Sequence, residues 1–251
     1  FPAGTSIKTP LLKRLSYSHP NNQGFDIKKL NKIDSIVRFA INEKMTPGAQ
    51  ILVARNGEVV YNKSFGTKTY HSKNKIEWND IYDLASLTKI LSTVPLMMEE
   101  YEKENITLET TLSEMFPNKN LNDKSNLSIK EMFSHQSRLF PWIPFYKNTI
   151  DSITKKPLDS WYRTKKSDNF TIKVNENLFL KEDFLDSIAL NINNSELYEN
   201  KSYVYSDLPY YYMKSFLEDK NNRNLDFQLK KNFSSHWVRI IKVIILLQFL
   251  I

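Results

Sequence analysis

Residues 83–100 read DLASLTKILSTVPLMMEE, a short strand-like run that leads into an apolar helical pattern. Ser86 and Lys89 stand three positions apart at the start of that pattern. Residues three apart on a helix share a face, so the Lys89 amine can approach the Ser86 hydroxyl. The first N–H groups of a helix lack partners within the helix and carry a positive partial charge, which stabilises an oxyanion. The pair therefore has the arrangement of a nucleophilic serine and its base.

Spacing alone does not make a catalytic pair, because the same pattern recurs at Ser72–Lys75 and Ser152–Lys155, both in polar segments. On spacing alone, a helix-capping hydroxyl and a surface charge remain the simpler interpretation of Ser86 and Lys89. Only Ser86 is followed by a long run of apolar residues at helical spacing. This context favours Ser86 among the three serines. Pro95 inside the run predicts a kink or a local break.

The composition is that of a folded protein. With 251 residues, 41% of them hydrophobic, the chain can form one large domain or two small ones. It contains no cysteine, which excludes disulfides, thiol catalysis and cysteine metal sites. Because the first residue is Phe1, we expect a processed product or a piece of a larger protein.

Charge and histidine placement argue against several kinds of site. The net charge of +7 comes from lysines scattered among asparagines, and the best basic and aromatic run, residues 162–166, is short for a nucleic-acid site. The four histidines show no paired ligand spacing; they are His19, His71, His135 and His236. We therefore expect no nucleic-acid partner, no metal and no cofactor.

The N-terminal third predicts an arm, a helix and a hairpin. Residues 1–24 have the composition of a linker or an extended arm. Asp26 is placed to cap a helix whose apolar positions recur up to Ile41. Two β-rich runs, residues 50–55 and 58–65, flank Asn56-Gly57, the pair that favours a type I′ turn. An antiparallel sheet is expected to start here.

The remaining segments predict mostly helices and loops. We expect short helices before Pro117 and after a capping box at Ser128, and a helix through Met213, Phe216 and Leu217 after the tyrosine-rich residues 203–210. His135, near the end of the second of these, is interpreted as a structural hydrogen-bonding residue rather than a catalytic base. Residues 151–198 are expected to be polar loop or short helix.

Residues 140–146 are too rich in aromatic residues and proline for a regular element. Two interpretations stay open for this segment. It is either a packed loop or the wall of a substrate cleft, in which case Trp142 and Tyr146 face the substrate.

Three stretches together resemble the serine β-lactamase and penicillin-binding protein superfamily, and most of all its class C β-lactamase and esterase branch. They are residues 83–89 (DLASLTK), 135–139 (HQSRL) and 205–208 (YSDL), in this order over about residues 25–233. The resemblance implies an α+β, β-lactamase/transpeptidase-like fold, in which an antiparallel sheet packs with helices and a helical subdomain is added.

The resemblance also implies roles for individual residues. Ser86 would form an acyl-enzyme, Lys89 would accept or relay its proton, and Tyr205 would pass a proton toward the leaving group. Asp207 stands where the family often has Asn, so a carboxylate there would hold Lys89 by charge. Arg138 stands where the family usually has Gly, so a differently shaped loop is expected after His135.

A narrower resemblance concerns residues 45–48, 82–89 and 141–146, which look like the serine-hydrolase module that follows a β-N-acetylhexosaminidase-type glycoside hydrolase module in bacterial envelope proteins. It implies a periplasmic or extracellular location, a small-molecule or cell-wall peptide substrate, and an upstream glycoside hydrolase module as partner in the full protein. No membrane span is expected.

The family's third motif, which ends in Gly, has no counterpart here, because all five glycines precede Ser86. We therefore expect a domain over residues 25–233 that lacks the later strands. Residues 234–251 form an atypical apolar tail, for which we expect an out-of-frame origin. The alternative is a membrane anchor, although residues 243–251 fall short of the roughly 20 apolar residues that a span requires.

Together these patterns predict a serine hydrolase that forms an acyl-enzyme on Ser86, of β-lactamase, D-amino-acid peptidase or carboxylesterase type, with activity impaired by the missing motif. The alternative is a non-catalytic fragment of a cell-wall-related protein of two modules, which at most binds peptidoglycan peptides.

Overall fold

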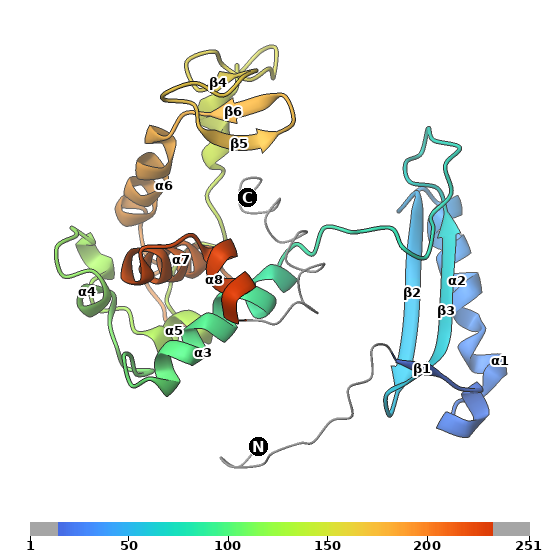
Figure 1. Cartoon of the computed structure of the whole chain (residues 1–251). Helices are drawn as coiled ribbons and strands as arrows, with labels where there is room; N and C mark the ends of the chain where they lie inside the picture. Colours follow the sequence, from blue (N-terminus) through green and yellow to red (C-terminus); the bar gives the residue numbers. More distant parts are fainter. Residues whose placement is uncertain (1–14, 233–251) are drawn as a thin grey trace. The chain divides into compact units, whose positions relative to one another are not determined.

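The computed structural model describes residues 15–232. The chain divides between Ile81 and Tyr82 into two compact units (Figure 1), which we describe separately. The expectations for residues 1–14 and for the apolar tail at 234–251 lie outside the described residues.

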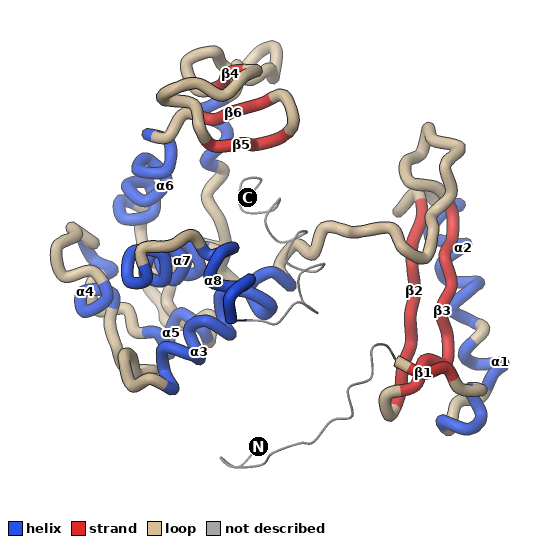
Figure 2. The backbone as a smooth tube through the Cα atoms, viewed as in Figure 1, coloured by secondary structure: helices blue, strands red, loops and turns tan. Residues whose placement is uncertain are grey.

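The N-terminal unit is a three-stranded sheet with strand order β1-β3-β2 and helices on one side (Figure 2). Strand β3 pairs antiparallel with β2 and parallel with β1. Its elements are β1 (Ser16–Tyr17), the 3-10 turn η1 (Pro20–Gln23), α1 (Ile27–Leu30), α2 (Lys32–Asn42), β2 (Gly48–Arg55) and β3 (Glu58–Gly66).

The predicted hairpin is confirmed. Arg55 pairs with Glu58, and the two residues between them, Asn56 and Gly57, have φ of 53° and 78°. Positive φ at both positions is what a type I′ turn requires, so the local sequence sets the register of the two strands.

The predicted helix after Asp26 forms as two segments rather than one. The Asp26 side chain accepts hydrogen bonds from the backbone N–H groups of Lys28 and Lys29, at 2.8 and 3.2 Å, so the predicted cap is confirmed. Asn31 ends α1 and starts α2. The buried core of this unit consists of Leu30, Val37, Val60, Tyr61 and Phe65.

Residues 15–24, the described part of the predicted linker or extended arm, contain two short elements. Ser16 and Tyr17 pair with Glu58 and Val59 of β3, and η1 follows. A two-residue strand is too short to show a β pattern in sequence, and backbone pairing needs no apolar side chains.

The C-terminal unit is mainly helical (Figure 1), and its core takes buried residues from each of its six described helices and from two of its strands. Its helices are α3 (Val94–Glu102), α4 (Leu112–Met115), α5 (Ile129–Phe133), α6 (Asp183–Asn194), α7 (Leu208–Asn221) and α8 (Leu225–Asn232). A π-helical turn η2 (Lys89–Thr93) precedes α3, and 3-10 turns are η3 (Asn122–Lys124) and η4 (Phe145–Thr149). Three short strands are β4 (Tyr162–Arg163), β5 (Ile172–Asn175) and β6 (Leu178–Leu180).

The prediction of polar loop or short helix for residues 151–198 is wrong in part. The segment contains a small antiparallel sheet of order β4-β6-β5 and the 12-residue helix α6. The strands have two to four residues and bury only Ile172 and Leu180. They are therefore too short to show the alternation of apolar and polar residues by which a strand is predicted.

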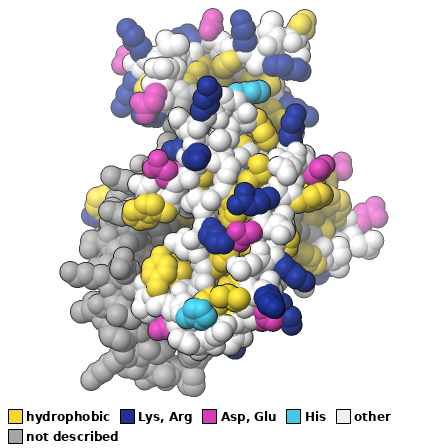
Figure 3. Space-filling view, turned by 90° about the vertical axis from the view of Figure 1, so that its right-hand side faces the viewer, with side chains coloured by type: hydrophobic (Ala, Val, Ile, Leu, Met, Phe, Trp, Pro, Cys, Tyr) yellow, Lys and Arg dark blue, Asp and Glu magenta, His cyan; other side chains and the backbone are white. Residues whose placement is uncertain are grey.

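Lys and Arg side chains lie singly or in small groups among acidic and uncharged atoms on the face drawn in Figure 3. This distribution matches the scattered lysines of the sequence. A dense basic stripe of the kind that binds nucleic acid is not seen on that face among the described residues.

Candidate active site

A tight turn presents Ser86 at the start of the π-helical turn. Asp83 Oδ1 accepts a hydrogen bond from the Ala85 N–H at 2.6 Å, and Ala85 has φ of 43°. The backbone then closes from Leu87 N–H to the Leu84 carbonyl at 2.9 Å. A non-glycine residue at positive φ is strained, and such strain recurs at functional turns. The turn leaves Ser86 exposed.

The π-helical turn η2 places Lys89 beneath Ser86. The Val94 N–H donates to the Lys89 carbonyl, five residues back, which defines the wider π turn. Pro95 follows immediately in the first turn of α3, so the predicted local break is confirmed. Lys89 is buried, with 8% of its surface exposed, and its Nζ donates to Ser86 Oγ at 2.9 Å.

The second partner of Lys89 is Asp207, whose Oδ1 lies 2.6 Å from Nζ. Oδ1 is shielded from solvent, and Lys89 is its one partner in the described part of the chain. The structure therefore joins Ser86, Lys89 and Asp207 in one chain of contacts, although Asp207 is far from the other two in sequence.

Residues 204–208 are held against the 135–141 segment by backbone hydrogen bonds. The Val204 N–H donates to the His135 carbonyl at 2.9 Å, and the Asp207 N–H donates to the Pro141 carbonyl at 2.8 Å. Buried Ser206 donates from Oγ to the Phe140 carbonyl at 2.6 Å. These bonds fix the turn that starts α7 and carries Tyr205 and Asp207.

Two tyrosine rings face the Lys89 ammonium. Nζ lies 5.3 Å from the ring centroid of Tyr205 and 5.5 Å from that of Tyr210, within cation–π range. Tyr210 was not among the predicted site residues. The sequence nevertheless contains a signal for Tyr210. It follows Asp207 by three positions at the start of a helix, so the two residues share one helix face.

His135 lies at the centre of this aromatic group. Its ring centroid is 4.6 Å from Tyr205, 5.8 Å from Tyr203 and 6.4 Å from Tyr210. Its Nδ1 accepts a hydrogen bond from the Ser206 N–H at 3.2 Å, in agreement with the predicted hydrogen-bonding role. Burial lowers the pKa of the imidazole below its usual value of 6.5, and the Lys89 charge lowers it further, while Asp207 acts in the opposite direction.

Residues 140–146 combine features of both interpretations left open. Phe145 is buried and packs edge to face on Tyr211 at 5.6 Å, as in a packed loop. Trp142 and Tyr146 are 55% and 50% exposed, so their rings remain available to a ligand. Contacts among the described residues do not join either ring to Ser86, and their substrate role stays a prediction.

Arg138 keeps the backbone conformation that glycine favours. Its φ is 61°, in the left-handed region, and its carbonyl accepts a hydrogen bond from the Tyr198 N–H at 2.9 Å. Replacing the family's usual Gly by Arg therefore coincides with a strained residue in this loop.

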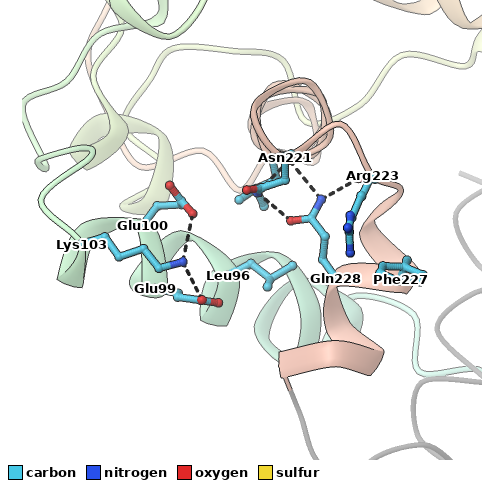
Figure 4. A pocket seen from close by; sticks show the side chains of 9 residues that line it. Leu96, Glu99, Glu100, Lys103, Asn221, Arg223, Phe227 and Gln228 are labelled. Atoms are coloured by element: carbon cyan, nitrogen blue, oxygen red, sulfur yellow. Dashed lines mark hydrogen bonds and ion pairs between the residues drawn. The ribbon is translucent and has the colours of Figure 1, made fainter.

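A separate cavity of about 220 Å³ lies between α3, α7 and α8 (Figure 4). Buried Glu100 lines it and pairs with Lys103 and Lys220 at 3.7 and 3.3 Å. None of its lining residues belongs to the Ser86 cluster. This cavity is therefore separate from the candidate site at the exposed turn of Ser86.

The part of the chain that the structure describes contains no cluster of three or more His, Asp or Glu residues fit to hold a metal ion. It also contains no helix with the length and hydrophobicity needed to cross a membrane.

The chain is similar in sequence to known proteins over a range that includes part of the candidate site. The Beta-lactamase family model matches residues 33–175, more than half of the chain. Ser86 and Lys89 fall within the matched range, and Tyr205 and Asp207 lie beyond it. Protein flp of Staphylococcus aureus (strain NCTC 8325 / PS 47) is 27% identical over 128 residues, which cover 50% of this chain and 25% of that protein.

Solved structures share the fold. A penicillin-binding protein homologue from Pyrococcus abyssi superposes with a TM-score of 0.59 at 18% identity over 81% of this chain and 42% of its own. FmtA from Staphylococcus aureus gives 0.55 at 16% identity over 88% and 51%. The hydrolase EstCE1 gives 0.56 at 18% identity over 84% and 50%. The chain thus spans about half the length of these structures or less, and a quarter of the length of the curated relative.

These likenesses confirm the predicted β-lactamase/transpeptidase-like α+β fold. The family match covers the turn that presents Ser86 to Lys89. The chain belongs to the beta-lactamase family.

Proposed function

We propose that Ser86 is the nucleophile of an acyl-transfer reaction to water. One observation carries the proposal: Lys89 Nζ lies 2.9 Å from Ser86 Oγ and 2.6 Å from Asp207 Oδ1. A serine hydroxyl is a weak nucleophile until a neighbouring group takes its proton. Lys89 is the group that contacts it.

The proposed reaction proceeds through an acyl-enzyme. Ser86 Oγ attacks the carbonyl carbon of an ester, amide or lactam, and its proton moves to Lys89 as the carbonyl oxygen becomes an oxyanion. The partial positive charge at the start of the helix stabilises that oxyanion. The bond to the leaving group then breaks, and the leaving group takes a proton from Tyr205, which regains one from the Lys89 ammonium. A water molecule hydrolyses the acyl-enzyme and restores the Ser86 hydroxyl.

Asp207 has a specific part in this scheme. An ammonium group has no electron pair with which to accept the Ser86 proton, so Lys89 must release one of its own protons before or during the attack. That proton goes to solvent, because a carboxylate such as Asp207, whose Oδ1 lies 2.6 Å from Nζ, is a far weaker base than an amine. The carboxylate holds Nζ in line with Ser86 Oγ, a positioning effect that a neutral side chain provides less strongly.

The relatives suggest the class of substrate. EstCE1 is described as a hydrolase with promiscuous acyltransferase activity, and other likenesses are to penicillin-binding protein homologues and a class C beta lactamase. We propose a β-lactam, an ester or a D-amino-acid peptide of the cell wall as substrate, and a periplasmic or extracellular location. An upstream glycoside hydrolase module remains a proposal for the full protein.

Covalent labelling tests the proposal. The chain is incubated with a fluorophosphonate or with benzylpenicillin and analysed by intact-mass spectrometry. We expect one adduct on the unaltered chain and none on Ser86→Ala. Ser152→Ala is the matched control, because Ser152 has the same spacing to Lys155, but the Lys155 Nζ donates to the Ser152 backbone carbonyl rather than to its hydroxyl.

Either of two results would overturn the proposal. One is the absence of any adduct on chain shown to be folded by circular dichroism, which would favour the alternative of a non-catalytic module that at most binds cell-wall peptides. The other is an adduct that persists in Ser86→Ala, which would place the reactive group elsewhere.

A further inference from the structure

His135 makes two kinds of contact with the turn that carries Tyr205 and Asp207. Its backbone carbonyl accepts from the Val204 N–H at 2.9 Å, and its Nδ1 accepts from the Ser206 N–H at 3.2 Å. The two bonds bracket Tyr205, whose ring packs on the imidazole at 4.6 Å. Tyr205, the proposed proton donor, is therefore held by hydrogen bonds at the residues on both sides of it.

The bond to Nδ1 exists in one protonation state of His135. An imidazole nitrogen accepts a hydrogen bond only while it carries no proton, so this contact requires a neutral ring with its proton on Nε2. A protonated ring would bring two donors, His135 Nδ1–H and Ser206 N–H, face to face. The turn would then have to move or the bond would be lost.

The groups around the ring add to this dependence. Lys89 faces it from η2, Tyr203, Tyr205 and Asp207 face it from the turn, and Tyr210 faces it from α7. A second cation beside the Lys89 ammonium is unfavourable, and the single carboxylate of Asp207 is already engaged by Lys89.

We infer that His135 is the positioning residue that holds Tyr205 and Asp207 within reach of Lys89, and that it does so only while its ring is neutral. The inference rests on the proposed function of Ser86 and adds a residue that touches none of the reacting atoms. Protonation of His135 would release the turn, pull Asp207 away from Lys89 and slow attack by Ser86. The chain would then lose reactivity as the His135 ring takes up a proton.

Two substitutions separate the hydrogen bond from the ring. His135→Asn keeps a neutral acceptor, Oδ1, near the place of Nδ1 and suits the positive φ of 56° at this position. His135→Phe keeps an aromatic ring beside Tyr205 and removes the acceptor. Fluorophosphonate labelling rates of both variants and of the unaltered chain are measured from pH 5 to pH 8, with urea midpoints to verify folding.

We expect the labelling rate of the unaltered chain at pH 8 to exceed that of His135→Phe by about tenfold, the size expected when one positioning hydrogen bond is lost. Relative to its own rate at pH 8, His135→Asn should lose about tenfold less than the unaltered chain at a pH where His135 is protonated, as judged by the NMR titration below. Equal labelling rates for His135→Phe and the unaltered chain at pH 8 would overturn the inference. So would an equal loss of labelling rate at acid pH in His135→Asn and the unaltered chain.

An NMR readout separates failure of this inference from failure of the proposed function. The Ser206 amide signal should shift with pH as His135 titrates, and should lose this shift in His135→Asn. If the signal titrates but no chain is ever labelled, the proposed function is refuted and the role of His135 in the turn is supported. If labelling occurs but the chemical shift of the Ser206 amide does not change when His135 is protonated, the inference is refuted and the proposed function stands.

Discussion

At the scale of single residues, the Lys89 ammonium is held between an exposed hydroxyl and a shielded carboxylate. The side chains of Lys89 and Asp207 are 10% and 23% exposed, so each charge depends on the other for compensation. Removing one member of a buried ion pair leaves an uncompensated charge, which costs more than the pair itself contributes.

We therefore predict that Lys89→Met lowers the free energy of unfolding by about 2 kcal/mol, less than the roughly 3–5 of a fully buried pair because Asp207 keeps some contact with water. The same substitution in an Asp207→Asn background should cost about 1 kcal/mol less, since no charge is stranded. Urea unfolding of the two single variants and the double variant measures this coupling. Strict additivity of the two effects would show that the ion pair does not stabilise the fold.

Arg138 permits a prediction in the opposite direction. With φ of 61°, its side chain opposes the backbone conformation that it occupies, whereas glycine adopts that conformation freely. Arg138→Gly should relieve about 1–2 kcal/mol of strain from the left-handed backbone conformation. Part of this gain is offset because an unfolded glycine has more conformational entropy, so we expect the free energy of unfolding to rise by about 0.5 kcal/mol. Ala189→Gly, at an exposed interior position of α6, is the control and should be about 1 kcal/mol less stable. A loss of stability in both variants by urea denaturation would contradict the strain argument.

The site residues differ in how far sequence could identify them. Ser86 and Lys89 are three positions apart, so helix geometry alone brings them together. Asp207 and Tyr205 reach Lys89 only through tertiary contacts with residues 135–141, and only the family resemblance pointed to them. Tyr210 belongs to none of the three resembling stretches, so only its helical spacing from Asp207 pointed to it, and its place near Lys89 follows from the packing of α7 against η2.

At the scale of elements, short helices depend on their first turns. The Ser128 N–H donates to Glu131 Oε2 at 3.1 Å, and the Glu131 N–H donates back to Ser128 Oγ at 3.3 Å, which is the predicted capping box. A five-residue helix has few internal hydrogen bonds, so this reciprocal pair is a large part of what fixes α5.

We predict that Ser128→Ala lowers the free energy of unfolding by about 1 kcal/mol, the usual cost of a lost N-cap. Ser134→Ala is the matched control, because exposed Ser134 at the other end of α5 only donates to the Glu131 carbonyl at 3.3 Å. Its effect should stay within about 0.5 kcal/mol, as for most surface substitutions. Equal losses in the two variants by thermal denaturation would show that the capping box adds nothing beyond a surface hydroxyl.

Which elements were predictable follows from the range of the interactions that form them. The hairpin needs only Asn56 and Gly57, and the caps need only residues three apart, so both could be read locally. The sheet β4-β6-β5 joins Tyr162 to Leu180 and Ile172 to Leu180, pairings that polar flanking residues do not reveal. Strand β1 likewise depends on a partner 42 positions away in sequence.

At the scale of the whole molecule, ionisable groups in both units favour the folded state between acid and alkaline limits. Hydrogen bonds to neighbouring N–H and O–H groups lower the pKa of Asp151 and Glu114 below their usual values of 3.8 and 4.5. Their contribution to stability is therefore present above these values and is lost as the pH falls through the lower folded pKa. The acid limit should lie near or below pH 4.

Tyrosines set the alkaline limit, and here the sign is reversed. Burial raises the pKa of Tyr61 in the N-terminal unit to about 12, with the Asp34 carboxylate adding to the shift, and burial raises the pKa of Tyr211 in the C-terminal unit to about 12, with Asp207 adding. A raised pKa means that the fold favours the neutral phenol. Stability is then fully present below the usual value of 10 and is lost as the pH rises toward 12.

We therefore predict that the urea midpoint stays level between pH 7 and pH 9 and falls steeply above pH 10, and that a late group of phenols ionises near pH 12 in the absorbance spectrum. Tyr211→Phe should lessen the alkaline fall, because it removes a phenol that the fold keeps neutral. Tyr101→Phe, at a tyrosine that is 53% exposed, is the control for loss of a hydroxyl and should leave the fall unchanged. If Tyr211→Phe and Tyr101→Phe follow the same curve as the unaltered chain, burial of Tyr211 does not couple its ionisation to folding.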